Sequence, residues 1–370
     1  MQRITTYRLA AALLAAAAAP VSALAADKSV SPASRAEVSV TGRCERLADG
    51  SVRYDWAGVY VQTDFTGGRI AATISCDGAS FHNVFVDGRF VRKIKVEGTD
   101  PQRVVLADGL GRGTHRLRLQ KCTEGEFGVV TLHNFVVDRQ SKLTAVKPAG
   151  RMIEVVGDSY TCGYGTESDR ADDPFELETE NCDKAYACIV ARYFDADYAL
   201  VAHSGQGIVR HYGDSVQVSA DNMPRRWRQV YDAHGARPYA FDAYTPQLVM
   251  INVGTNDFSP TAIPSVEQYV GGYVALIDSI RARYPEAALL CVTPHSASPY
   301  LSAALEVLRV KVASLDRVFM ANRLDNVVSG SGDLGASWHP NYRGQKKIAM
   351  SLIPQVATIM GWEMTGCAVE

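Results

Sequence analysis

Four short segments of the chain carry residue types that could attack an ester. In chain order they are Gly157-Asp158-Ser159, Ser204-Gly205-Gln206-Gly207, Gly254-Thr255-Asn256-Asp257 and Trp338-His339-Pro340. A serine hydrolase needs a hydroxyl nucleophile, a base that takes its proton, and hydrogen-bond donors for the oxyanion. Ser159 can supply the nucleophile and His339 the base. The backbone amides of Ser159 and Gly205 and the side chain of Asn256 can supply the donors.

Each segment alone has an ordinary structural explanation. A Gly-Asp-Ser triplet occurs at many strand-to-helix turns, a Gly-Thr-Asn-Asp run is often only a turn, and a single surface histidine is usually inert. Together, in this order and each at the end of a predicted strand, they predict two-step acyl transfer. His339 deprotonates Ser159, Ser159 attacks the acyl carbonyl, and water activated by His339 releases the acid. This chemistry requires no metal and no organic cofactor.

Apolar strands alternate with helices in the second part of the chain, and these elements must position the four segments. We expect strands at 153–156, 198–202, 248–251 and 288–292. We expect a helix capped by Asp183, a helix that Ser265 opens, and a last helix from about Gly344. Their inward residues are Tyr186, Ile189, Val190 and Tyr193, then Val270, Val274 and Ile277, then Ile348, Leu352, Val356 and Ile359. This alternation predicts a parallel sheet with helices on both faces, whose functional residues lie at the carboxyl ends of the strands.

The first part of the chain, residues 38–140, is typical of an all-β domain. Residues 69–74 and 115–120 alternate apolar with polar side chains, and residues 128–132 form a further apolar run. The segments 84–86 and 90–91 flank Asp87-Gly88, a strong signal for a β-hairpin. Many short strands without helical periodicity predict a β-sandwich. The boundary near Pro148-Ala149-Gly150 is short, so we expect the two domains to pack together.

The four segments resemble the consensus blocks of the SGNH (GDSL-like) hydrolases, and in particular those of the family-2 carbohydrate esterases. The longer matching stretches are 157–165, 204–210, 252–258 and 338–341, with 55–59 and 127–129 matching parts of the N-terminal domain. The resemblance implies a jelly-roll β-sandwich followed by a three-layer α/β/α domain at 150–365. It implies a carboxylic ester hydrolase that removes acetyl groups from polysaccharides or oligosaccharides of the xylan or glucomannan type. An acetylated carbohydrate is therefore the expected partner.

One departure from the resemblance concerns the acid that would orient His339. Family members with a full triad have an aspartate two residues before the histidine, and other SGNH enzymes have it three residues before. Here these positions hold Ser337 and Ala336, neither of which can be an anion. Some family members orient the imidazole with a backbone carbonyl, so we expect a Ser159–His339 dyad. Asp333 and Asp325 are near in sequence, but nothing in the sequence places them against His339.

Three further residues are candidates for binding substrate. Trp338 adjoins the base and could stack on a sugar ring, although plain packing explains it equally well. Tyr164 and Arg210 could line the cleft or could be structural. Asp158 is expected to stabilise the nucleophile turn, Asp257 to order the Asn256 loop, and His203 to be structural. The remaining histidines have no catalytic context.

The N-terminus has the features of a secretory signal peptide. Arg3 and Arg8 form a basic start, an apolar run covers 9–19, and Ala23-Leu24-Ala25 offers a small-residue cleavage site. We therefore expect residues 1–25 to be removed and the mature protein to be periplasmic or secreted. Export permits disulfides. A bridge from Cys162 to Cys182 or Cys188 would clamp the loop beside Ser159, and the alternative is that most cysteines are free buried thiols.

The composition narrows the classes of partner. The net charge is −2 and there is no basic patch, which argues against nucleic acid as a partner. No later segment is long and apolar enough to span a membrane. Two other functions remain open: a different SGNH enzyme, such as a lipase, thioesterase or peptidoglycan O-acetylesterase, and a carbohydrate-binding protein that has lost catalysis.

Overall fold

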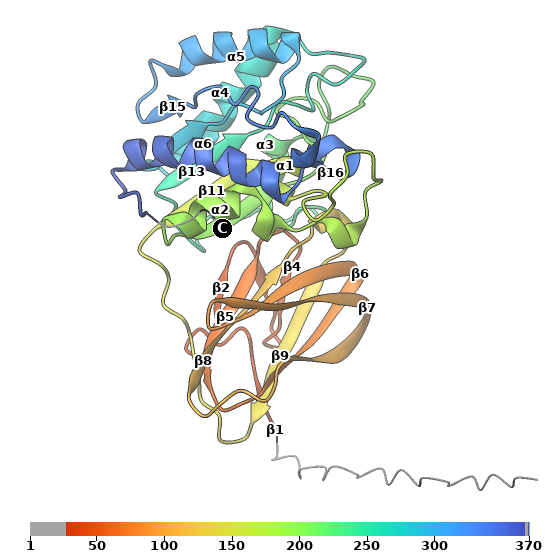
Figure 1. Cartoon of the computed structure of the whole chain (residues 1–370), viewed down its shortest axis with the longest axis vertical. Coiled ribbons are helices and arrows are strands. Elements are labelled where there is room, and N and C mark those ends of the chain that lie inside the picture. The colour runs from red at the N-terminus through yellow and green to blue at the C-terminus, as the bar shows by residue number, and fades with distance from the viewer. Residues whose placement is uncertain (1–26, 367–368, 370) are drawn as a thin grey trace, which may run out of the picture.

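The computed structural model describes residues 27–366 and residue 369. Two regions of different architecture follow one another along the chain (Figure 1). The strands of residues 27–144 form the lower part in that view, and the helices and strands from residue 152 onward form the upper part. The predicted signal peptide, residues 1–25, lies outside the described residues.

The N-terminal region is an antiparallel β-domain. Its strands form one hydrogen-bonded network of 10 strands, and every pair in it is antiparallel. They are β1 (Asp27–Val30), β2 (Ser39–Thr41), β3 (Glu45–Arg46), β4 (Val52–Tyr54), β5 (Tyr60–Thr66), β6 (Ile70–Val86), β7 (Arg89–Ala107), β8 (Thr114–Lys121), β9 (Val130–Asp138) and β10 (Leu143–Thr144). The all-β prediction is confirmed, while the jelly-roll connectivity and the exact domain boundaries stay predictions. Strands β1 and β10 lie outside the predicted range of 38–140.

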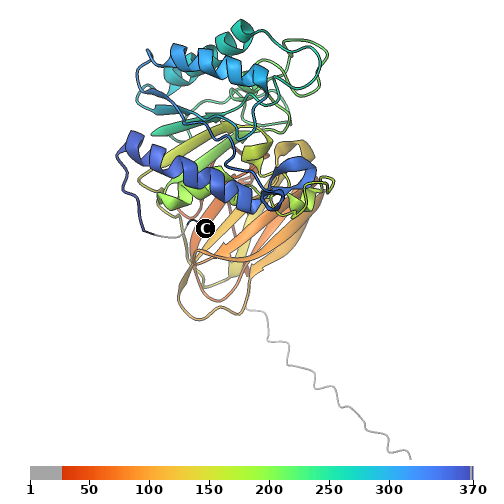
Figure 2. The same ribbon diagram turned by 45° about the horizontal axis from the view of Figure 1, so that its top comes forward.

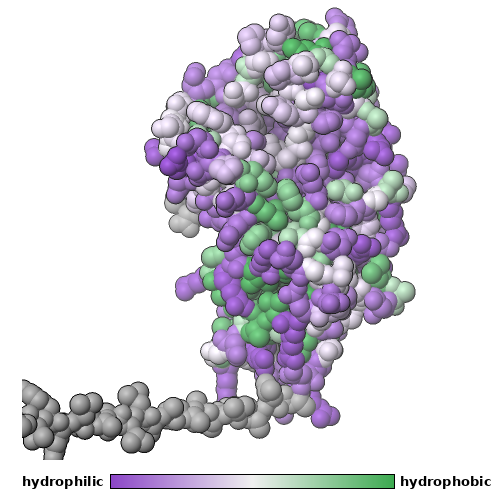
Figure 3. Space-filling view, turned by 90° about the vertical axis from the view of Figure 1, so that its right-hand side faces the viewer, coloured by the Kyte–Doolittle hydropathy of each residue, from purple (hydrophilic) through white to green (hydrophobic). Residues whose placement is uncertain are grey.

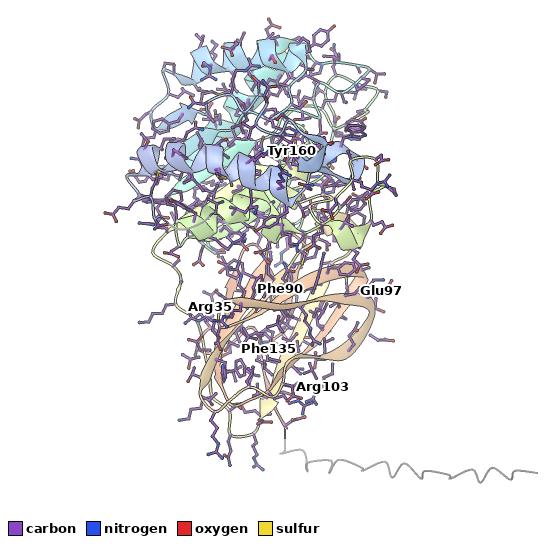
Figure 4. All side chains as sticks on the ribbon, in the orientation of Figure 1. Arg35, Phe90, Glu97, Arg103, Phe135 and Tyr160 are labelled. Atoms are coloured by element: carbon purple, nitrogen blue, oxygen red, sulfur yellow. The ribbon has the colours of Figure 1, made fainter. Side chains whose placement is uncertain are left out.

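The predicted hairpin at Asp87-Gly88 joins β6 to β7. Val86 pairs with Arg89, so the connection is a two-residue loop. Both loop residues have positive φ, 52° for Asp87 and 76° for Gly88, as a type I′ turn requires. The two strands that this turn joins are much longer than the sequence pattern indicated. β6 continues past several register shifts and pairs with β7, β8 and β9. Figure 4 shows Phe135 of β9 among the strands and Arg103 of β7 near their lower end.

The second region is an α/β domain built on a parallel five-stranded sheet of order β12-β11-β13-β14-β15. Its main elements are β11 (Met152–Gly157), α2 (Tyr186–Tyr193), β12 (Asp197–Ala202), α3 (Met223–Arg226), β13 (Leu248–Asn252), α4 (Val266–Arg283), β14 (Ala288–Cys291), α5 (Pro299–Val312), β15 (Val318–Met320) and α6 (Tyr342–Met360). Short elements lie between them: α1 (Ser159–Cys162), η2 (Leu177–Thr179), η3 (Cys182–Lys184), η4 (Ser331–Asp333), β16 (Leu334–Gly335), η5 (Ala336–Trp338) and β17 (His339–Pro340).

Helices cover both faces of this sheet, as predicted. One buried cluster joins alternate sheet residues, such as Val156 and Ile251, to α4 and α5. The other joins the opposite set, such as Val155 and Met250, to α2 and α6. Figure 2 shows α6 lying across one face of the sheet and α4 and α5 on the far side. No described helix is long and apolar enough to cross a bilayer.

Most predicted elements of this domain are confirmed, with two corrections. Ser265 caps α4 through a complete capping box with Gln268. Asp183 does not cap α2: the N-cap is Ala185, and Asp183 lies in the preceding η3, where its carboxylate accepts from Arg192 at 2.9 Å. The last helix starts at Tyr342 rather than at Gly344, because the side chain of Asn341 caps it.

The two domains pack closely through buried polar contacts. The Asp55 carboxylate accepts hydrogen bonds from the backbone amides of residues 232–234. The Trp56 indole donates to the Val230 carbonyl at 2.9 Å. Buried polar groups must be paired to be tolerated, so these bonds fix one domain against the other. This confirms the expectation that the domains pack together.

The cysteines form no disulfide among the described residues: Cys44, Cys76, Cys122, Cys162, Cys182, Cys188 and Cys291 are free. The proposed bridge from Cys162 is not formed because its thiol faces the Glu124 carboxylate, 3.7 Å away. Cys182 instead points to the Lys121 carbonyl, at 3.4 Å. The loop beside Ser159 is therefore held by hydrogen bonds and packing.

Candidate active site

The four predicted segments meet at the carboxyl edge of the parallel sheet. Ser159 begins α1 directly after β11, Gly205 follows β12, and Asn256 follows β13. His339 comes from the short β16–β17 hairpin before α6. All four residues line one pocket of about 910 Å³.

Ser159 and His339 are in direct contact. The Ser159 Oγ lies 2.9 Å from His339 Nε2. The other ring nitrogen, Nδ1, lies 3.0 Å from the Ser337 carbonyl oxygen. Because a carbonyl can only accept, Nδ1 carries the proton and Nε2 is left to accept the serine hydroxyl proton. Burial lowers the pKa of His339, which keeps the imidazole neutral and able to act as a base.

Asp158 fixes the turn that presents Ser159. Its side chain caps α1 by accepting from the Tyr160 amide at 3.1 Å. Burial raises the pKa of Asp158 to about 7. It makes no contact with His339, which agrees with its predicted role in stabilising the turn.

The hydrogen-bond donors expected for the oxyanion come from residues that line the same pocket as Ser159. Among the described residues, neither the Ser159 amide nor the Gly205 amide donates to a protein acceptor. Gly205 has a φ of 78°, a left-handed conformation that a side chain would disfavour. The Asn256 Nδ2 donates to the Gln206 carbonyl at 2.9 Å and lies 3.4 Å from Asp158 Oδ2. These are the donor types that an oxyanion hole requires.

Asp257 and Arg210 hold the loops that carry these donors. The Asp257 carboxylate accepts from the amides of Ile208, Val209 and Arg210 at 2.7 to 3.1 Å, so it ties the Asn256 loop to the Gly205 loop. The Arg210 guanidinium is fully buried and donates to carbonyls of Asp214, Asp257 and Pro260. Arg210 is not part of the pocket lining, which corrects its interpretation as a residue that lines the cleft. Its guanidinium hydrogen-bonds to loop carbonyls instead.

The two other substrate-binding candidates do line the pocket. Trp338 is 68% exposed. Tyr164 stacks on His339, with ring centroids 4.2 Å apart. Figure 3 shows that the side of the molecule on the right in Figure 1 is mostly hydrophilic, with apolar side chains grouped near the middle, in the lower part and at the top.

Two pocket residues with ring side chains, His295 and Tyr212, were not among the sequence candidates. His295 follows β14, its Nδ1 has no hydrogen-bond partner, and its ring lies 4.9 Å from that of Tyr160. Burial lowers the pKa of His295 to about 4. Tyr212, beyond the Gly205 segment, is 60% exposed at the pocket. His295 lies three residues beyond the predicted strand 288–292, at the strand end where functional residues are expected. The sequence analysis gave it no catalytic context, and the structure places it in the pocket lining.

Glu124 of the β-domain contacts the loop that carries Gly205. Its Oε2 accepts the Ser204 amide at 2.7 Å, one residue before Gly205. His203 donates to Asp232 at 2.9 Å. Although burial opposes it, Asp232 and Glu124 raise the pKa of His203 to about 9. His203 is therefore a charged structural residue under the oxyanion loop.

The two aspartates near His339 in sequence do not reach it. The Asp333 carboxylate binds Lys347 at 2.5 Å and Arg343 at 3.2 Å, and Asp325 pairs with Arg323 at the surface. We therefore expect Asp333→Asn and Asp325→Asn each to change turnover of an aryl acetate by less than about tenfold, against ~10⁴ for a true triad aspartate. Asp333→Asn should also lower the melting temperature, because the substitution removes the buried carboxylate that pairs with Lys347.

Steady-state kinetics with a melting curve for each variant test this expectation. Asp325→Asn serves as the control, because its ion pair is exposed and contributes little to stability. A collapse of turnover in either variant with an intact fold would mean that an acid acts on His339 from further away.

A serine facing a neutral imidazole beside unpaired amides, on a parallel sheet covered by helices, defines a nucleophilic acyl hydrolase. Comparison with known families agrees. Residues 155–347, more than half of the chain, match the GDSL-like lipase/acylhydrolase family, and residues 40–146 match the carbohydrate esterase 2 N-terminal domain. The chain belongs to the GDSL-like lipase/acylhydrolase family and is a carboxylic ester hydrolase.

Named relatives include carbohydrate esterases. The chain is 32% identical over 317 residues to the cellulase/esterase CelE of Acetivibrio thermocellus, covering 83% of this chain but only 38% of that longer protein. It is 28% identical to an acetylxylan esterase/glucomannan deacetylase of Cellvibrio japonicus, covering 89% of this chain and 91% of the relative.

Solved structures of family-two carbohydrate esterases share the fold. One from Clostridium thermocellum, in complex with cellohexaose, has a TM-score of 0.80 at 29% identity and covers 88% of this chain and 100% of that chain. One from Cellvibrio japonicus has a TM-score of 0.79 at 25% identity, with 91% and 99% covered.

Proposed function

We propose that this protein removes O-acetyl groups from polysaccharides or oligosaccharides of the xylan or glucomannan type, through an acetyl-enzyme on Ser159. The observation that carries the proposal is the 2.9 Å contact between Ser159 Oγ and His339 Nε2 within the pocket that Gly205 and Asn256 share. Relatives named as acetylxylan esterases and glucomannan deacetylases support the choice of substrate.

The reaction follows from the geometry in two halves. His339 Nε2 takes the hydroxyl proton while Ser159 Oγ attacks the acetyl carbonyl carbon, and the oxyanion forms beside the amides of Ser159 and Gly205 and the side chain of Asn256. The tetrahedral intermediate collapses as His339 gives the proton to the sugar oxygen. Water, deprotonated by the same imidazole, then releases acetate and restores Ser159.

The rim of the pocket suits a carbohydrate. Trp338 and Tyr212 both line the pocket and are 68% and 60% exposed, so their rings are open to a ligand. Aromatic faces combined with polar edges suit sugar rings. We infer that the two rings contact the chain that bears the acetyl group.

We also propose that the protein works outside the cytoplasm. The sequence of residues 1–25 has the basic start, apolar run and small-residue site of a signal peptide. An acetylated polysaccharide is too large to enter a cell intact, which agrees with an exported enzyme.

We expect acetyl esters to be hydrolysed much faster than octanoyl esters. Of the described residues that line the pocket, only Val328 and Leu334 have aliphatic side chains, and six serines and a threonine lie among the rest. Such a lining offers no apolar channel for a long acyl chain. Rates on p-nitrophenyl acetate and octanoate measure the preference, and an equal or reversed preference would favour a lipase.

Acetate release from acetylated xylan, glucomannan and peptidoglycan tests the substrate class. Release from the plant-type polysaccharides supports the proposal. Release from peptidoglycan alone would assign the protein to another esterase class, and binding without any release would assign it to the carbohydrate-binding proteins.

A further inference from the structure

His339 lacks the anion that most serine hydrolases place behind their base. In a triad the carboxylate fixes the imidazole tautomer and stabilises the imidazolium that forms. The Ser337 carbonyl, 3.0 Å from Nδ1, fixes the tautomer but carries no full charge. Within the part of the chain that the structure describes, no carboxylate forms an ion pair or hydrogen bond with His339. The group that stabilises the imidazolium form of His339 therefore remains to be identified.

A column of aromatic rings stands behind His339. The Tyr164 ring lies 4.2 Å from the imidazole, centroid to centroid, with 31° between the planes. Phe175 stacks on Tyr164 at 4.1 Å and 26°, and Phe127 stacks on Phe175 at 5.6 Å and 24°. The rings of His339 and Phe175 both lie about 4 Å from that of Tyr164, at 31° and 26° to its plane. Two rings cannot share one face at that distance, so they cover opposite faces of Tyr164. The Tyr160 ring packs in a T-shaped contact with the imidazole, with 5.6 Å between the ring centroids and 69° between the planes.

The segment that carries Phe175 also fixes the carbonyl that His339 uses. The Ser337 amide donates to the Asp173 carbonyl at 2.9 Å, and the Trp338 amide donates to the Ala171 carbonyl at 3.0 Å. Ser337 and Trp338 have φ angles of 52° and 64°, which are unfavourable for residues other than glycine. These two hydrogen bonds hold the strained turn and so aim the Ser337 carbonyl at Nδ1.

We propose that the ring of Tyr164, backed by Phe175 and Phe127, does the work of the missing carboxylate by holding the His339 imidazole and stabilising its cationic form. Tyr164 is then a positioning residue for the base. Phe127 belongs to η1 (Gly125–Phe127), a short helix between β8 and β9 of the β-domain. The N-terminal domain therefore supports the base through this column and the oxyanion loop through Glu124.

The physical basis is the attraction between a cation and an aromatic face, which is strongest where water is excluded. The titratable groups that face His339 are Tyr160, Tyr164 and His295. Burial raises the pKa values of both tyrosines and lowers that of His295, so all three are neutral when His339 becomes charged. The Ser337 and Ala336 backbones face it from its own turn. Glu124, Glu126 and Glu180 lie beyond Tyr164 and act on it electrostatically.

The test compares Tyr164→Leu with Tyr164→Phe, and it rests on the proposed esterase function. Tyr164→Phe keeps the ring and should keep kcat on p-nitrophenyl acetate within about threefold. Tyr164→Leu removes the ring and should lower kcat roughly five- to thirty-fold with little change in KM, the size of a desolvated cation–π contact. A rise in KM alone in Tyr164→Leu would make Tyr164 a substrate-binding residue and overturn the proposal.

The pH profile gives a second readout, with a definite sign. His339 must be neutral to accept the serine proton, and its lowered pKa puts the midpoint of the acid limb of kcat/KM below 6.5 in the unaltered enzyme. Loss of a group that stabilises the imidazolium lowers the pKa further, so the midpoint should move to lower pH in Tyr164→Leu. A move toward 6.5 would indicate mere exposure of His339 to water and would count against the proposal.

Two further measurements distinguish the role of Tyr164 from an effect on folding and from a failure of the proposed esterase function. Phe175→Leu, in a half-buried position, should lower the midpoint by a smaller amount in the same direction. Titration of His339 by NMR in Ser159→Ala, with and without Tyr164→Leu, measures the imidazole pKa without any turnover. An unchanged pKa overturns the inference even if the esterase is active, whereas a lack of hydrolysis in the unaltered enzyme would overturn only the proposed function.

Discussion

Ser159→Ala should abolish hydrolysis of p-nitrophenyl acetate while the fold stays intact. The hydroxyl is the nucleophile in the proposed reaction, and its partner in the structure is His339 Nε2, at 2.9 Å. Loss of the nucleophile removes the covalent path altogether, so we expect a fall in kcat of at least ~10⁴-fold, as in other serine hydrolases. The fold should survive because α1 keeps its cap from Asp158.

Initial rates over a wide range of enzyme concentration measure this loss, together with a melting curve and a near-ultraviolet spectrum. Ser296→Ala is the matched control, since Ser296 lines the same pocket and is expected to keep nearly full activity. If Ser159→Ala retains more than a few per cent of the rate, another group is the nucleophile.

The sequence predicted the site better than it predicted the exact elements. Ser159, Gly205 and Asn256 could be placed because parallel strands end at one edge of the sheet, so a residue that follows each strand must come near the others. His339 could be placed relative to them only through the resemblance. It comes from a two-stranded hairpin, β16–β17, whose strands of two residues leave no periodic signal.

Other features depend on contacts that no local pattern contains. The long strands β6 and β7 were missed because their pairing runs past register shifts that interrupt the alternation of apolar and polar residues. Arg210 was a candidate for lining the cleft or for a structural role, and only the fold shows carbonyls of three loop residues around its guanidinium. Phe127 and Phe175 are 48 positions apart in sequence, so their stacking on the Tyr164–His339 pair could not be inferred from spacing.

Asn256 should prove to be the oxyanion donor with the largest single effect. One hydrogen of its Nδ2 is held by the Gln206 carbonyl at 2.9 Å, and the other meets only a 3.4 Å contact with Asp158. The second hydrogen is therefore available to an oxyanion that forms in the pocket, while the first fixes the amide in place. We expect Asn256→Ala to lower kcat by about 10² to 10³, the usual value of one such donor, with little change in KM.

The reason for the split between kcat and KM is that the carbonyl oxygen gains its charge only as Ser159 adds to it. A donor aimed at that oxygen stabilises the transition state more than the bound ester, so its loss slows the reaction without weakening binding. Asn256→Asp is the sharper variant, since it has nearly the same shape but replaces the donor with an acceptor that carries charge. It should therefore be slower than Asn256→Ala, although it leaves less empty space. If instead both variants raise KM at constant kcat, Asn256 binds the substrate and the oxyanion is held by the Ser159 and Gly205 amides alone.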